Sequence, residues 1–130
     1  MKFSISLEGL DALEALPGKS NQARQAIARA MHDDASTVLN ESKRIVPVDL
    51  GTLKNSGKVS RPKVTANEIE VDITYGGAAA PYAIYVHENP EARHAPGKTY
   101  KYLERPMMAH ADKFARNVKI AFLAWLKGGI

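Results

Sequence analysis

The sequence predicts an α+β fold, in which a small and mostly antiparallel sheet packs against two long amphipathic helices. The prediction rests on a clean two-residue alternation of apolar residues in 69–75, and on two stripes of apolar residues at helical spacing in 20–45 and 106–127. At 130 residues and 14.2 kDa, the chain is expected to form a single domain over residues 1–130, with a modest core.

The composition is that of an ordinary globular protein, with 45% hydrophobic and 25% charged residues. No apolar run approaches the ~20 residues of a membrane-spanning helix, and no signal peptide is expected. The lack of cysteine excludes disulfides and thiol catalysis, and it fits synthesis in a reducing cytoplasm. The net charge of +4 permits contact with nucleic acid or an acidic protein surface without requiring it.

The first third of the chain predicts a strand, a helical turn and a long helix. Apolar and polar residues alternate in 1–7, which indicates a half-buried strand, and residues 10–16 favour a brief helical turn. Ser20 is expected to cap a helix that runs to about Ile45 and ends before Pro47. Two roles remain open for this helix: a plain core helix, or one whose exposed remainder makes subunit contacts.

The next segment predicts a turn and a short helix. Asp49 is placed to cap a helix over residues 50–55, with Leu50 and Leu53 facing inward. A ligand-binding role for the Asp49 carboxylate is the alternative to this local cap.

A hairpin follows, with residues 69–75 as its clearest strand and residues 58–64 as the partner. Pro62 cannot donate a hydrogen bond to a sheet, so the partner is expected at an edge. On the outer face of the hairpin, basic side chains lie opposite acidic ones, and this face is expected to be solvated. These charged residues are Arg61, Lys63, Glu68, Glu70 and Asp72.

The apolar run Tyr82–Val86 is too short for its periodicity to separate helix from strand. We expect it to be structural, with the ring of Tyr85 buried. The polar residues 89–100 predict a loop that is mobile in the free protein and becomes ordered against a partner. The alternative is an ordinary solvated loop without a partner. Its candidate contact residues are Arg93, His94 and Lys98.

The last helix is expected to begin at or near Pro106, where the missing N–H costs nothing, and to end before Gly128-Gly129. Its inward stripe comprises Met107, Ala111, Phe114, Ala115, Val118, Ala121, Phe122, Trp125 and Leu126. Ile120 and Leu123 lie off this stripe and would face solvent in a monomer. They are therefore the candidate residues of an oligomer interface.

The sequence offers no catalytic constellation, so no enzymatic activity, cofactor or small-molecule substrate is expected. His87, Glu88 and His94 include metal-ligand types, but the H-E-x-x-H spacing is absent and Pro90 lies between them. No serine stands in a G-x-S-x-G elbow, and Gly76-Gly77 lacks the Lys-Ser/Thr of a phosphate loop.

Nucleic-acid binding is the alternative function, because basic residues with interleaved aromatics can track phosphates and stack bases. The basic residues are Lys58, Arg61, Lys63, Lys98, Lys101, Arg105, Lys113, Arg116 and Lys119, with Tyr100 and Tyr102 among them. Against this alternative, acidic residues stand beside the basic strand and no nucleic-acid module motif is present.

Three motifs in order resemble the head–tail joining proteins of long-tailed bacteriophages, also called tail-completion, neck or minor capsid proteins. The first is a P-V-D-x-G-x-L-x-x-S corner at residues 47–56, and the second is a Y-A-x-Y-V-E-like segment at residues 82–88. The third is an aromatic–Leu pair followed by Pro, at residues 102–106. After Glu88 the family pattern continues towards Phe-Gly, whereas this chain has Asn89-Pro90.

The resemblance implies a structural protein of the phage neck or tail end, which assembles as a ring and joins the DNA-filled head to the tail. It implies self-association, contacts with other neck and tail proteins, and passage of DNA through the ring. It also implies a place in the virion after assembly in the host cytoplasm, with no membrane partner. The motif residues carried over are Asp49, Gly51, Leu53, Tyr82, Tyr85, Glu88 and Pro106.

Overall fold

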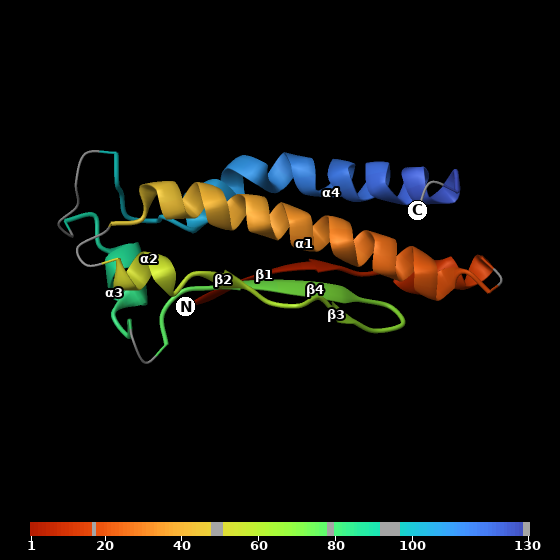
Figure 1. The fold of residues 1–130 in the computed structure, drawn as a ribbon, viewed down its shortest axis with the longest axis horizontal. Helices are drawn as coiled ribbons and strands as arrows, with labels where there is room; N and C mark the ends of the chain where they lie inside the picture. The colour runs from red at the N-terminus through yellow and green to blue at the C-terminus, as the bar shows by residue number, and fades with distance from the viewer. Residues whose placement is uncertain (17, 48–50, 78–79, 92–96, 129–130) are drawn as a thin grey trace.

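The computed structural model describes residues 1–16, 18–47, 51–77, 80–91 and 97–128. It confirms the α+β class, with an antiparallel sheet and two long helices (Figure 1). In chain order the elements are β1 (Lys2–Leu7), the 3-10 helix η1 (Leu10–Ala15), α1 (Ser20–Ile45), α2 (Thr52–Asn55), β2 (Lys58–Val59), β3 (Lys63–Val64), β4 (Ile69–Thr74), α3 (Ala83–Glu88) and α4 (Glu104–Leu126).

Strand β4 is the centre of the sheet, with β1 antiparallel on one side and β2 and β3 antiparallel on the other. Its Ile69, Val71 and Ile73 are fully buried, which confirms the alternation predicted for this strand. The predicted partner over residues 58–64 is split into two short strands at the edge. Pro62 lies in the break, where its missing N–H removes no sheet hydrogen bond.

Helix α1 covers the sheet and buries the apolar stripe predicted for it. Its end at Ile45 is also as predicted, because Val46 adopts an extended backbone before Pro47. The predicted cap is wrong, since Ser20 is the first helical residue and Lys19 holds the capping position without a side-chain hydrogen bond. The Lys19 N–H instead bonds to the Leu16 carbonyl at 3.1 Å in the reversal that precedes the helix.

Helix α4 packs along α1 (Figure 1), and its packing against the sheet is slight. We expected both long helices to cover one side of the sheet; α1 does so, while α4 packs mainly along α1 and lines a shared hollow with β1. Because α4 has one main neighbour, its apolar stripe is only partly covered: Trp125 is buried, but Phe114, Val118 and Phe122 are half-buried. The helix begins at Glu104, two residues before the buried Pro106, and Gly128 (φ 78) follows its end.

One charged residue of the sheet is far less solvated than predicted. Asp72 is only 5% exposed, and it accepts a 2.6 Å hydrogen bond from Ser4 Oγ on β1. That bond lowers the pKa of Asp72, with the charges of Lys2 and Lys63 as smaller contributions. Lys63 Nζ lies 3.5 Å from Asp72 and 3.7 Å from Glu70. The outer face of the sheet therefore holds a paired carboxylate that ties β1 to β4.

Two tyrosines fill the end of the core beyond the sheet. Tyr75 is 2% exposed, and its hydroxyl lies 2.8 Å from Ser42 Oγ on α1. Burial raises the pKa of Tyr75 to about 12, while the Ser42 hydrogen bond opposes this shift. The fully buried Tyr102 meets Tyr75 edge-on at 5.0 Å between ring centroids. This aromatic pair fixes the position of the segment that enters α4.

The turn before α2 shows why a glycine stands in the first motif. Gly51 precedes the helix with a left-handed backbone (φ 78), which favours glycine over residues with a Cβ. Leu53 is 4% exposed, so its predicted inward orientation is confirmed. The helix begins at Thr52, and the predicted cap Asp49 and its neighbour Leu50 lie outside the described residues.

Candidate assembly surfaces

The three motif segments, far apart in the sequence, lie at one end of the molecule, which we call the α3 end (Figure 1). A hydrogen bond connects the second and third segments, because the Tyr102 hydroxyl donates to the Ala83 carbonyl at 2.7 Å. In the first segment, Ser56 Oγ accepts the N–H of Gly76, just beyond the end of β4, at 2.9 Å. Leu53, Ala83 and Tyr102 are all buried in the same hydrophobic core.

His87 connects helix α3 to helix α4. The side chain is 1% exposed and stands edge-on to Tyr102 at 4.9 Å between ring centroids. Its Nε2 accepts the backbone N–H of Glu104 at 3.2 Å, so the imidazole proton lies on Nδ1, which is 2.6 Å from the Glu88 carboxylate. The first turn of α4 is thus held by the imidazole of His87.

Glu88 and Lys101 close this junction at the surface. Lys101 Nζ donates to Glu88 Oε1 at 2.8 Å, and the Lys101 N–H donates to the His87 carbonyl at 2.7 Å. The bond from Lys101, and after it the bond from His87, lowers the pKa of Glu88. The same Glu88 bond raises the pKa of Lys101. In this position Lys101 has a left-handed backbone (φ 55), which is uncommon for residues other than glycine.

The Glu88–Lys101 pair should stabilise the fold between the ordinary pKa values of its members, 4.5 and 10.5. A carboxyl whose pKa is lowered by folding loses its contribution as pH falls through the folded pKa. An ammonium whose pKa is raised loses its contribution as pH rises through the folded pKa. Glu88→Gln should therefore lower the Tm at neutral pH, and the difference from wild type should shrink in acid. Thermal unfolding from acid to neutral pH measures this.

The matched control for this pair is Glu91→Gln, at an exposed carboxylate for which the described residues show no ion pair. It should leave the Tm close to wild type at each pH. A Glu88→Gln difference that stays constant from acid to neutral pH would contradict the role given to this carboxylate.

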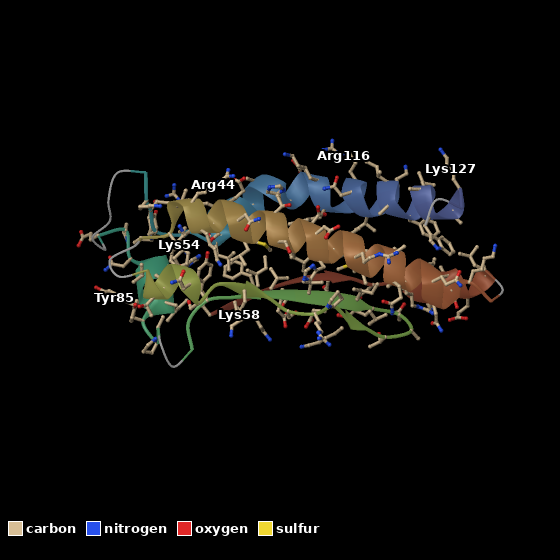
Figure 2. All side chains as sticks on the ribbon, viewed as in Figure 1. Arg44, Lys54, Lys58, Tyr85, Arg116 and Lys127 are labelled. Atoms are coloured by element: carbon tan, nitrogen blue, oxygen red, sulfur yellow. The ribbon has the colours of Figure 1, made fainter. Side chains whose placement is uncertain are left out.

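The run Tyr82–Val86 is only partly structural, and the prediction that Tyr85 is buried is wrong. Helix α3 turns Ala83 and His87, four residues apart, into the core. This leaves Tyr82 43% exposed, Ile84 54% exposed and Tyr85 65% exposed. Figure 2 shows Tyr85 at the α3 end. The Tyr85 hydroxyl accepts a hydrogen bond from Asn89 Nδ2 at 2.8 Å. The α3 end therefore presents an apolar and aromatic surface to solvent.

Helix α4 presents a second apolar surface. Ile120 is 59% exposed and Leu123 is 44% exposed, as predicted for residues off the inward stripe. Met108 and Leu126 are also exposed, at 70% and 47%. Leu126 had been placed on the inward stripe, and this is wrong. Four large apolar side chains on one helix form a surface suited to protein contacts.

The candidate residues of the loop at 89–100 are placed only in part. Arg93 and His94 lie outside the described residues. Lys98 Nζ donates to the Arg44 carbonyl at 2.7 Å, and the Thr99 N–H donates to the Ile45 carbonyl at 2.8 Å. Lys98 therefore satisfies carbonyl groups at the end of α1, a structural role that the sequence did not indicate.

Within the described residues, no three His, Cys, Asp or Glu side chains come together in a way that would hold a metal ion. Among the helices that the structure describes, none has both the length and the apolar character to cross a membrane. The hollow beside Trp125, of about 430 Å³, is open to solvent and lined by Asn21, Gln22, Gln25 and Arg29.

The structural role of one residue at the α3 end was not predicted from the sequence. His87 was considered as a metal ligand, whereas the structure makes it a buried connector between two helices. Its spacing of four from Ala83 was the available signal, but a six-residue helix is too short for that signal to stand out.

The chain was also compared with protein-family models, with curated proteins and with solved structures, and none of them matched.

Proposed function

We propose that this chain is a structural protein of a phage neck or tail end, which assembles as a ring and joins the DNA-filled head to the tail. The observation that carries the proposal is that the three motif segments gather at the α3 end, where each contributes a buried residue to the same core and the second and third are hydrogen-bonded to each other. Motifs that only form separate local turns would not need to lie close together in the folded protein. Their convergence supports the resemblance to head–tail joining proteins as a property of the whole fold.

Two exposed apolar surfaces support assembly. Tyr82, Ile84 and Tyr85 project from the α3 end, while Ile120 and Leu123 project from α4. A ring needs a head-to-tail contact between two different patches of the same chain, since a repeated two-fold contact gives closed dimers. The two surfaces lie on different elements, as such a contact requires. Other neck and tail proteins are the further partners, with assembly in the host cytoplasm and a final place in the virion.

The test is the assembly state of a variant of α4. Replacing Ile120 and Leu123 together with lysine should leave the monomer folded and reduce ring formation, because charged side chains would have to be desolvated in the contact. Light scattering after size exclusion measures the mass, and negative-stain images with and without purified tail tubes show the assembly.

The control is Ala12→Lys with Ala66→Lys, which adds the same charge at two exposed alanines elsewhere. It should assemble like the wild type. An unchanged oligomer in the α4 variant would refute the role of this helix. A wild-type protein that is monomeric at high concentration, both alone and with tail tubes, would refute the proposed ring.

Nucleic-acid binding is the second candidate. It is favoured by Arg116 and Lys127, which project from α4 away from the rest of the molecule (Figure 2) and make no ion pair within the described residues. By contrast, Lys63 and Lys101 are paired with carboxylates. Binding to a DNA duplex that weakens steeply between about 50 and about 200 mM salt would support this candidate. Assembly with little salt dependence and no DNA binding would reject it.

A further inference from the structure

Strand β1 leaves one edge of the sheet open. Met1 and Tyr75 exchange two backbone hydrogen bonds, at 2.9 Å and 3.0 Å, so the odd-numbered residues of β1 bond to β4. The backbone N–H and C=O groups of Lys2, Ser4 and Ser6 then point to the open edge. Within the described residues, they make no hydrogen bond to another element. The backbone groups of these three residues could therefore form hydrogen bonds with an additional strand.

The opposite edge of the sheet is protected. There the chain breaks between β2 and β3, and Pro62 in the break cannot donate to an incoming strand. Proteins commonly block exposed strand edges with prolines, breaks and short strands, because an open edge recruits other chains. Protection of one edge and not of the other indicates that the β1 edge is kept open for pairing.

An apolar groove runs beside the open edge, between β1 and α4. It consists of two hollows of about 240 Å³ and 290 Å³, which share Leu7, Ala115 and Val118 as lining residues. Ser6 also lines it, so the groove reaches the open strand edge. Ile5 and Leu7, the inward residues of β1 that line it, are only half-buried. We call it the β1–α4 groove.

One carboxylate lies among the apolar lining of the groove. Asp34 on α1 lines it, and its Oδ1 accepts a 2.9 Å hydrogen bond from Asn117 Nδ2 on α4. Burial raises the pKa of Asp34, and the Asn117 hydrogen bond opposes this shift. A cationic side chain that enters the groove would favour the charged carboxylate.

We propose that the β1–α4 groove binds an extended segment of another protein as an additional strand on β1. The segment would place aliphatic side chains in the groove at alternate positions, with a lysine among them opposite Asp34. Backbone pairing supplies affinity in this mode of recognition, and the pockets for alternate side chains supply specificity. The inference goes beyond the proposed ring, because it concerns a different surface and is tested on the chain alone.

A second copy of β1 fits the groove less well. Paired on the open edge, it would direct Phe3, Ile5 and Leu7 into the groove and place no positive charge beside Asp34. A lysine-containing segment satisfies both the apolar lining and the carboxylate. This difference selects a partner segment over self-pairing.

The probe is the synthetic peptide Thr-Val-Thr-Lys-Thr-Val-Thr, which presents Val, Lys and Val on one face when extended. It should bind saturably, and the amides of Ser4 and Ser6 should become protected from hydrogen exchange, as measured by NMR. A peptide with Glu in place of Lys should bind about tenfold more weakly, because it sets a second carboxylate against Asp34. In Asp34→Asn the preference for the Lys peptide should be lost.

Two alanines of α4 provide a matched pair of variants. Ala115→Lys fills the groove and should abolish binding, whereas Ala109→Lys places the same side chain at an exposed position outside the lining. The Ile120→Lys, Leu123→Lys variant should bind the peptide like the wild type, which separates this site from the ring contact. Absence of binding at millimolar peptide overturns the proposal, and so does equal binding by Ala115→Lys. Protection of Ser4 and Ser6 in the free protein would mean self-pairing and would also overturn it.

Discussion

Tyr102→Ala should lower the free energy of unfolding by about 3–5 kcal/mol, the usual cost of removing a large buried ring. The ring is fully buried and packs edge-on against both Tyr75 and His87, so its removal leaves a cavity between three segments. The Ala83 carbonyl would also lose the hydroxyl that donates to it at 2.7 Å. Urea denaturation followed by circular dichroism measures the change.

The matched control is Tyr85→Ala, the same change at a ring that is 65% exposed. It should stay within about 0.5 kcal/mol of wild type, as surface substitutions do. Tyr102→Phe keeps the ring, removes the hydroxyl and should cost roughly 1 kcal/mol. Similar losses for Tyr102→Ala and Tyr85→Ala would show that the α3 end does not pack as described.

Gly57→Ala should destabilise the protein by about 1–3 kcal/mol, the usual range for overpacking a core. A Cβ at this position would lie 2.7 Å from Cε1 of Tyr75 and 3.0 Å from Cδ1 of Leu39. Tyr75 cannot yield easily, because its hydroxyl bonds to Ser42 and its ring packs on Tyr102. Chemical denaturation of the single variant gives the cost.

A double-mutant cycle with Tyr75→Leu isolates the cause. Without the tyrosine ring, the added methyl group has room, so Gly57→Ala should cost much less in the Tyr75→Leu background. Equal costs in both backgrounds would show that the strain does not come from contact with the ring of Tyr75.

Local patterns predicted the elements well. Alternation placed β1 and β4, and helical spacing with Pro47 placed the end of α1. These signals succeed because the period of apolar residues depends only on the geometry of the backbone. The exposure of Ile120 and Leu123 followed from the same spacing.

The errors share a different cause. Tyr85 was expected inside and Asp72 in solvent, and both assignments depend on which neighbouring element covers the position. Tyr85 lies on a helix too short to show a period, and Asp72 is covered by Ser4 from a strand 68 residues earlier. Neither partner can be found from residues near the position itself.

Helix α4 shows most clearly what the sequence determines and what only the tertiary structure decides. Its residues determine that it is a helix and which of them share a face. Its place along α1 and beside the open edge of β1 comes from packing between segments distant in the chain. That packing leaves the β1–α4 groove open, with Asp34 among its lining residues. A periodic pattern specifies the faces of a helix or strand, whereas the free energy of burial between distant segments decides what lies against each face.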